Sequence, residues 1–150
     1  MDAPNTHQVF DWLWSSGQLS ISDIARLSLY KIDTVINLAP PTSSSALVGE
    51  AELITRLGIN YIQIPVVWEA PDLLQLRRFC DLLDSLQGCP TWVHCALNMR
   101  VSAFLYLWRR IRRGEDHDTA AFPLNAVWQP DKRWQQFINQ GLVANLQASV

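Results

Sequence analysis

The sequence lacks the features that mark membrane, secreted or nucleic-acid-binding proteins. Its longest apolar run, from Val101 to Trp108 and broken only by Ser102, is far too short to span a bilayer. The 12 Lys and Arg residues nearly balance the 14 Asp and Glu residues, so general nucleic-acid binding is not expected. The first residues lack the basic start and apolar segment of a secretory signal. These absences predict a cytoplasmic protein with no membrane or nucleic-acid partner.

Cysteine is also scarce. Cys80, Cys89 and Cys95 are odd in number and show no metal-ligand spacing, so neither a disulfide framework nor a zinc site is indicated. We therefore expect a reduced, intracellular protein that uses no metal and no cofactor. There is no internal repeat or low-complexity linker, and 150 residues favour a single domain over residues 1–150.

Apolar residues, by contrast, are plentiful and regularly spaced. They make up 49% of the chain and include seven tryptophans, which predicts a large core with much aromatic packing. Short β-branched runs alternate with segments of helical period, which favours a single α/β domain with a mostly parallel sheet of about four or five strands flanked by helices. The expected strands are 34–38, 60–64 and Trp92-Val93, with a strand or extended arm over 9–19. The expected helices are one capped by Ser20 or Ser22, then 46–57, 71–87, one from Val101 to the arginines, a stretch over 119–128 that Pro123 compromises, and one capped by Asp131.

The stretch 91–113, TWVHCALNMRVSAFLYLWRRIRR, is the centre of the chain. A strand that enters a helix through a short loop directs backbone N–H groups and the positive end of the helix dipole at one spot, which predicts an anion site. Cys95 begins this loop, where its thiolate is favoured, and Arg100 ends it with a planar fork of donors suited to phosphate. The amide donors of the predicted cradle belong to Ala96, Leu97, Asn98, Met99 and Arg100. A buried, inert cysteine at a strand end is the alternative interpretation.

His94-Cys95 followed by Arg100 at the head of an apolar helix resembles the signature of the cysteine-dependent dual-specificity-like and protein tyrosine phosphatases. Further landmarks of this family are similar in kind and order: 16–18, 34–38, 64–66, 98–104, Trp128 and Trp134. They look most like those of a bacterial subgroup with a shortened loop. The resemblance implies hydrolysis of a phosphomonoester, on a phosphorylated protein or a small phosphoester, through a cysteinyl-phosphate intermediate.

The loop departs from the usual signature of that family. Four residues rather than five separate Cys95 from Arg100, none of them is glycine, and Val101 comes between Arg100 and Ser102. We expect Asn98 to adopt the left-handed conformation that the missing glycine would have taken. The resemblance implies that His94 orders the loop, and Ser102 is the candidate for a hydrogen bond to the Cys95 sulfur.

The resemblance also implies a general acid on a loop before the cysteine. Glu69, on the loop Val66 to Ala70, is the predicted acid. Asp72 is the second candidate, although a role at a helix N-terminus explains it equally well. Val67 is apolar where an aspartate would be expected in this subgroup.

Two other functions are compatible with the loop. Rhodanese-like sulfurtransferases also carry a cysteine on a strand-helix loop of this shorter length. A catalytically weak protein that only binds a phosphorylated ligand is the non-enzymatic alternative. Elsewhere, Cys89 could resolve an oxidised Cys95 as a disulfide. A solvated, cationic helix end is expected from Arg109, Arg110, Arg112 and Arg113.

Overall fold

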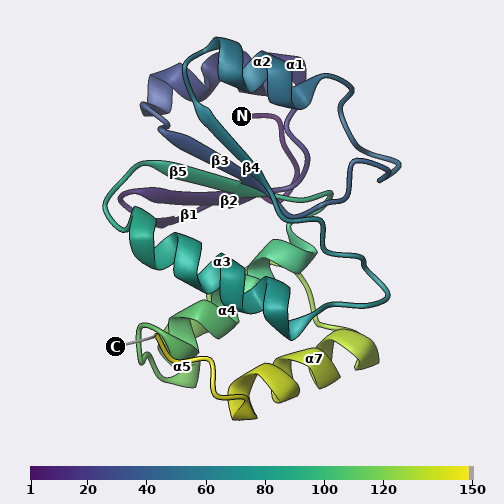
Figure 1. Ribbon diagram of the computed structural model, residues 1–150, viewed down its shortest axis with the longest axis vertical. Coiled ribbons are helices and arrows are strands. Elements are labelled where there is room, and N and C mark those ends of the chain that lie inside the picture. The colour runs from purple at the N-terminus through teal and green to yellow at the C-terminus, as the bar shows by residue number, and fades with distance from the viewer. Residues whose placement is uncertain (149–150) are drawn as a thin grey trace.

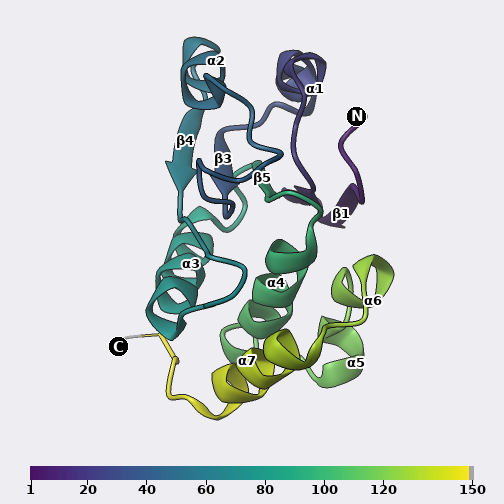
Figure 2. The same ribbon diagram turned by 90° about the vertical axis from the view of Figure 1, so that its right-hand side faces the viewer.

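A computed structural model describes residues 1–148 and has one five-stranded sheet between two layers of helices (Figures 1 and 2). The strand order is β1-β2-β5-β3-β4, and all neighbours are parallel except β1 and β2. The predicted α/β fold with a mostly parallel sheet is therefore confirmed. The strands are β1 (His7–Phe10), β2 (Leu13–Ser16), β3 (Thr34–Asn37), β4 (Asn60–Gln63) and β5 (Thr91–His94).

Helices cover both faces of this sheet. Figure 2 shows α1 and α2 on one face and α3, α4 and α7 on the other. The helices are α1 (Ile21–Arg26), the 3₁₀ helix η1 (Leu27–Tyr30), α2 (Glu50–Arg56), α3 (Leu73–Leu86), α4 (Met99–Ile111), α5 (His117–Ala120), α6 (Leu124–Val127) and α7 (Lys132–Val143). Within residues 1–148, none of these helices has the length and apolar character needed to cross a membrane.

The alternation of side chains along the inner strands explains the two layers. In β3, Val35 packs into the core under α1 and α2, whereas Ile36 packs into the core under α3 and α4. Trp92 and Val93 of β5 divide in the same way, because successive strand residues point to opposite faces. All four residues of β5 are buried. The chain therefore leaves the centre of the sheet at Cys95.

The predicted bounds were wrong where local conformation overrides apolar spacing. Helix α2 begins at Glu50 rather than at Ala46, because Gly49 has φ 79°, a left-handed conformation that a helix cannot contain. Leu47 packs against the core from a turn that precedes the helix.

Helix ends show where capping decides the start. Helix α3 begins at Leu73 rather than at Pro71, since the Asp72 carboxylate accepts a hydrogen bond from the Leu74 amide at 2.6 Å. Ser20 and Asp131 cap α1 and α7, as predicted. The segment 119–128 divides into α5 and α6 around Pro123, and 9–19 contains part of a β-hairpin.

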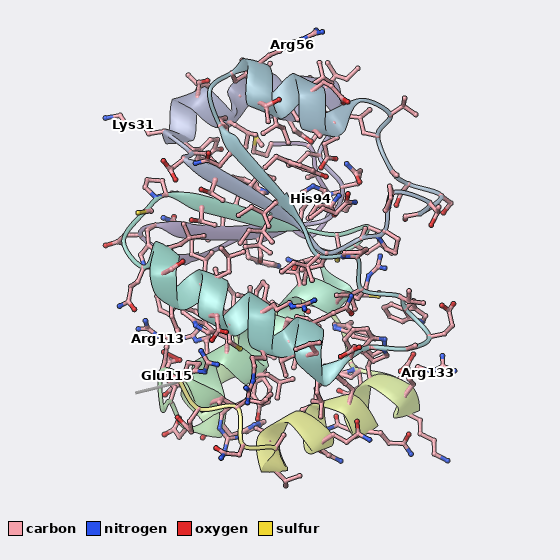
Figure 3. The ribbon with its side chains drawn as sticks, viewed as in Figure 1. Lys31, Arg56, His94, Arg113, Glu115 and Arg133 are labelled. Atoms are coloured by element: carbon pink, nitrogen blue, oxygen red, sulfur yellow. The ribbon has the colours of Figure 1, made fainter. Side chains whose placement is uncertain are left out.

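Two of the arginines at the end of α4, Arg109 and Arg112, do not lie on the predicted solvated face. Arg109 is only 7% exposed, and its Nε donates to Glu115 at 2.6 Å. Arg113 Nε donates to the same carboxylate at 2.9 Å, and Figure 3 shows the side chains of Arg113 and Glu115 together. Arg112 pairs with two aspartates of α3. Three of the four cations therefore bind carboxylates, either Glu115 just after the helix or two aspartates of α3, and the sequence pattern did not reveal this pairing.

Candidate active site

The topology places Cys95 where three parallel strands end. It follows β5, whose neighbours β2 and β3 run in the same direction. The loops after β3 and β4 extend beyond the same end of the sheet, on the right in Figure 1. Parallel α/β sheets commonly bind ligands at the carboxyl ends of their strands.

Asn98 joins the cysteine loop to α4. Its φ of 66° is left-handed, as expected from the absence of glycine. Its Nδ2 donates to the backbone oxygen of Asn5 at 2.8 Å and to Ser15 Oγ at 3.0 Å. The asparagine therefore supplies both the turn and an attachment of the loop to the N-terminal segment.

The carbonyl groups of the loop face donors of the surrounding scaffold. Ala96 O accepts from the backbone N–H of Gln18 at 2.9 Å, and Leu97 O accepts from the side-chain Nδ2 of Asn5 at 2.9 Å. Cys95 O lies 3.1 Å from His94 Nδ1. The backbone carbonyls of residues 95–97 are thus engaged on one side of the loop.

Gly17 permits this close attachment. A Cβ atom at this position would lie 2.5 Å from Ala96 O and 2.6 Å from Pro4 Cγ, which is closer than side-chain atoms approach. The same residue donates its backbone N–H to Pro4 O at 2.7 Å. Packing thus explains the glycine in the segment 16–18, because only glycine fits between the N-terminal segment and the loop.

The backbone N–H donors of the loop, unlike its carbonyls, are largely without partners within residues 1–148. The backbone N–H groups of Ala96, Leu97, Met99 and Arg100 have no acceptor within residues 1–148. They belong to the loop and the first turn of α4, a helix of 13 residues whose N-terminal partial charge is positive. This arrangement can bind an oxyanion.

Arg100 adds a cation to the same place. It is 7% exposed, and its Nη1 donates to Val66 O at 2.9 Å. Its Nε is buried and has no partner within residues 1–148. A buried donor without an acceptor is costly, so this nitrogen is a site at which an anionic ligand gains a strong hydrogen bond.

A cavity of about 190 Å³ opens over this donor set. A second hollow of about 490 Å³ shares Trp68, Ala96 and Arg100 with it and extends to the loop 40–45 and to Glu69. Asp72 lines neither hollow, since it caps α3. Of the two candidate acids, Glu69 therefore lines a hollow together with Arg100, whereas Asp72 does not. The cavity itself is lined by Trp68, Cys95, Ala96, Leu97, Met99 and Arg100.

Aromatic residues of the C-terminal segment support one wall of the cavity. The Trp68 ring lies 5.4 Å from the Trp128 ring and 5.4 Å from the Trp134 ring, measured between centroids. The Arg100 guanidinium carbon lies 6.0 Å from the Trp68 ring centroid, within the range of a cation–π contact. Trp128 and Trp134 thus hold the side chain that borders the cation.

Ser102 does not make the expected hydrogen bond to the Cys95 sulfur. Its hydroxyl donates to Met99 O at 3.0 Å and accepts from Trp128 Nε1 at 3.2 Å. The inserted Val101 places Ser102 one residue further along the helix, where its hydroxyl bonds back to the preceding turn. Ser102 therefore supports the aromatic wall rather than the sulfur.

His94 is fully buried behind the loop, and Figure 3 shows its side chain in the interior of the molecule. Its Nε2 lies 2.7 Å from Glu50 Oε2, and Glu50 also accepts from Gln18 and Asn37. Burial opposes ionisation of Glu50, but the hydrogen bond and charge of His94 and the Gln18 amide together hold the pKa of this carboxyl below its usual range. The sequence interpretation missed Glu50, because an acidic residue in a first helical turn ordinarily faces solvent.

Cys89 cannot form the disulfide that was considered for Cys95. Cys89 precedes β5 and Cys95 follows it, so the four-residue strand separates them. At about 3.3 Å per strand residue this separation exceeds the roughly 7 Å limit between the Cα atoms of a disulfide. All three cysteines are free.

Comparisons with known proteins were made at the level of sequence and of structure. No protein-family model and no curated protein matches the sequence. Among solved structures, a protein of Shewanella putrefaciens CN-32 described as "Putative phosphatase (DUF442)" is 30% identical, with a TM-score of 0.81 over 93% of this chain and 92% of that one.

More distant structural matches share the fold. TpbA of P. aeruginosa is 15% identical, with a TM-score of 0.74 over 91% of this chain and 84% of its own. The core catalytic domain of the PP-IP phosphatase SIW14 from S. cerevisiae is 15% identical, with a TM-score of 0.71 over 93% and 86% of the two chains. The identity and coverage of the Shewanella match are high enough to define the family: this protein belongs to the DUF442 phosphatase-like family.

Proposed function

We propose that the protein is a cysteine-dependent phosphatase that hydrolyses a phosphomonoester. The observation that carries the proposal is a set of donors around Cys95 that have no acceptor within residues 1–148. It comprises four loop and helix N–H groups and the buried Nε of Arg100. This set has the composition needed to bind the three outer oxygens of a phosphoryl group.

In the proposed reaction, the Cys95 thiolate attacks phosphorus and the ester oxygen leaves on the opposite side. Glu69, protonated at the start, gives its proton to the leaving oxygen, and the product is an alcohol or phenol together with a cysteinyl-phosphate. Glu69 then takes a proton from water, whose oxygen attacks phosphorus and releases phosphate and the thiolate. Arg100 and the loop N–H groups hold the outer oxygens throughout.

The lining of the two hollows bears on the substrate. Arg100 is the one cation that lines either hollow within residues 1–148, and Trp68, Leu97 and Met99 are apolar. This lining favours a monoester with an uncharged organic group, such as protein phosphotyrosine, phosphoserine or a small phosphoester, over a polyphosphorylated molecule. One crystal structure of TpbA holds phosphotyrosine, which is consistent with this class.

Hydrolysis of an aryl phosphate tests the proposal. The wild-type protein should release phosphate between about pH 5 and 8. Cys95→Ser should reduce turnover by about 10³-fold or more, because the attacking thiolate is lost. The matched control is Cys89→Ser, an exposed cysteine at the other end of β5, which should leave turnover unchanged.

Two results would refute the assignment of the protein as a cysteine-dependent phosphatase. One is the absence of phosphate release by the wild-type protein over the whole pH range. The other is turnover that survives in Cys95→Ser. Transfer of sulfur from thiosulfate to cyanide would support the sulfurtransferase alternative, and phosphate binding without turnover would support the non-enzymatic one.

A further inference from the structure

A buried hydrogen-bond network behind the cysteine loop stabilises the charge of the Glu50 carboxylate. Gln18 Nε2 donates to Glu50 Oε1, and Asn37 Nδ2 lies 3.4 Å from Glu50 Oε2. The orientation of each amide is fixed independently: Asn37 Oδ1 accepts from the Ala39 N–H at 2.9 Å, and Gln18 Nε2 also donates to Leu19 O at 3.1 Å. Both oxygens of Glu50 therefore face donors, which stabilises the ionised carboxylate.

The charge of His94 follows from its two neighbours. Its Nε2 lies 2.7 Å from the Glu50 carboxylate, which can only accept. Its Nδ1 lies 3.1 Å from the Cys95 carbonyl, which also can only accept. Both ring nitrogens therefore face acceptors, and the doubly protonated imidazolium ring is the form that can donate to both. Such a buried ion pair persists only when the remaining hydrogen-bonding positions of its charged groups are satisfied, and both oxygens of Glu50 have donors.

We propose that Glu50 is a positioning residue that holds His94 as an imidazolium behind Cys95, so that a buried positive charge lies against the backbone of the nucleophile and favours its thiolate. The catalytic consequence rests on the proposed function, whereas the charge state of His94 does not. Glu50 thereby links α2, at the end of the loop 39–49, to the cysteine loop.

Other titratable groups around this pair do not replace Glu50. Tyr61 of β4 accepts from Asn37 Nδ2 at 3.0 Å, and burial raises the pKa of Tyr61 far above the physiological range, so it stays neutral. Glu52, the next acidic residue of α2, is exposed. Within residues 1–148, neither lysine nor arginine pairs with Glu50. The imidazolium is therefore the cation that faces this carboxylate.

Glu50→Gln changes the charge while keeping the shape. The amide oxygen can still accept from Gln18, and the amide nitrogen, in the place of Oε2, can donate to His94 Nε2, which then needs no hydrogen. Asn37 Nδ2, which lies 3.4 Å from that place, keeps the Tyr61 hydroxyl as its acceptor. His94 keeps one hydrogen on Nδ1 for the Cys95 carbonyl and becomes neutral. Glu52→Gln removes an exposed carboxylate from the same helix and is the matched control.

Nitrogen-15 NMR of the His94 ring measures the charge directly. At about pH 7, where a free histidine is mostly neutral, the wild-type ring should show two protonated nitrogens and the Glu50→Gln ring one. This measurement requires no substrate. The Glu52→Gln ring should resemble the wild type.

Alkylation of Cys95 by iodoacetamide measures the consequence, since the thiolate is the reacting form. The experiment uses a Cys89→Ser background. Cys80 should not react, because it is buried and its pKa is raised to about 12 by burial. At about pH 6, Glu50→Gln should lower the fraction of Cys95 that is present as thiolate, and alkylation should slow by about ten-fold in proportion to that fraction. At about pH 9.5 the rates should converge, which a merely structural defect would not produce.

His94→Asn is a second way to remove the positive charge behind Cys95. The asparagine amide can donate to the Cys95 carbonyl as Nδ1 does, but it carries no charge. Alkylation at about pH 6 should slow to a similar extent, and the double variant with Glu50→Gln should be no slower than either single variant, because each single variant already removes the positive charge at position 94.

Two outcomes would overturn the inference: a wild-type His94 ring with one protonated nitrogen, or equal alkylation rates of the wild type and Glu50→Gln at about pH 6. If Glu50→Gln does not fold, the wild-type NMR measurement decides alone. If the wild type fails to hydrolyse aryl phosphate, the proposed function is refuted, while the NMR and alkylation results still decide the role of Glu50.

Discussion

The two sides of the loop 95–100 differ in how completely their polar groups are bound. On the scaffold side, the carbonyls of Cys95, Ala96 and Leu97 all face donors. On the cavity side, four N–H groups and Arg100 Nε lack acceptors within residues 1–148. The loop is thus fixed before a ligand arrives, and on the cavity side the groups left over, the backbone N–H groups and Arg100 Nε, are donors. Preorganised donors of this kind bind developing negative charge without a reorganisation cost.

This difference has an energetic side. Each buried donor without an acceptor costs stability, so the cavity side stays in this state only because the scaffold side fixes it. Substitutions on the cavity side should therefore reduce turnover and leave stability nearly unchanged. Substitutions on the scaffold side should alter stability as well.

Arg100→Lys should have the largest effect on the cavity side. Lysine can still donate to Val66 O, but it has no second donor in the position of Nε. The kcat/KM for an aryl phosphate should fall by about 10²- to 10³-fold, while the free energy of unfolding changes by less than about 1 kcal/mol. Steady-state kinetics and urea unfolding measure the two quantities.

Arg133→Lys, on the exposed face of α7 (Figure 3), is the control and should change neither quantity. A large loss of stability in Arg100→Lys with little loss of turnover would reverse the assignment of Arg100 to the cavity side.

Glu69→Gln should have the next largest effect, and only on substrates that need a proton. With a poor leaving group such as an alkyl phosphate, kcat should fall by about 10²-fold, since general acids contribute about this much or more. With a nitrophenyl phosphate, whose leaving group needs little protonation, the change should be small. Asp72→Asn, which retains a capping side chain at α3, should not distinguish the two substrates. Equal slowing of both substrates by Glu69→Gln would show that Glu69 is not the acid.

Acid should weaken the scaffold side through Glu50. Because the pKa of Glu50 is lower in the folded protein than its ordinary value of 4.5, its contribution to stability is present above that pH and is lost as the pH falls through the folded pKa. The wild type should therefore lose its advantage over Glu50→Gln between about pH 5 and 3, as measured by urea unfolding. A difference between the two that does not vary with pH in this range would contradict this.

The sequence predicted the parts of the fold that depend on local pattern. The buried strands, the Asp131 cap and the left-handed Asn98 all follow from residue types within a few positions. The start of α2 was missed because the spacing of Leu47 is the same in a helix and in a packed turn. The arginine cluster of α4 was misjudged because its carboxylate partners belong partly to α3.

Sequence by itself predicted the proposed nucleophile and the proposed phosphate-binding arginine of this protein. Cys95 and Arg100 lie in one strand-loop-helix, where short spacing fixes their separation. Tertiary structure alone decided the rest. It placed Glu69 rather than Asp72 on the hollow beside the cavity and brought Glu50 into contact with His94. The physical reason is that such contacts join residues of separate elements, whose approach depends on the packing of the whole sheet and its two helical layers.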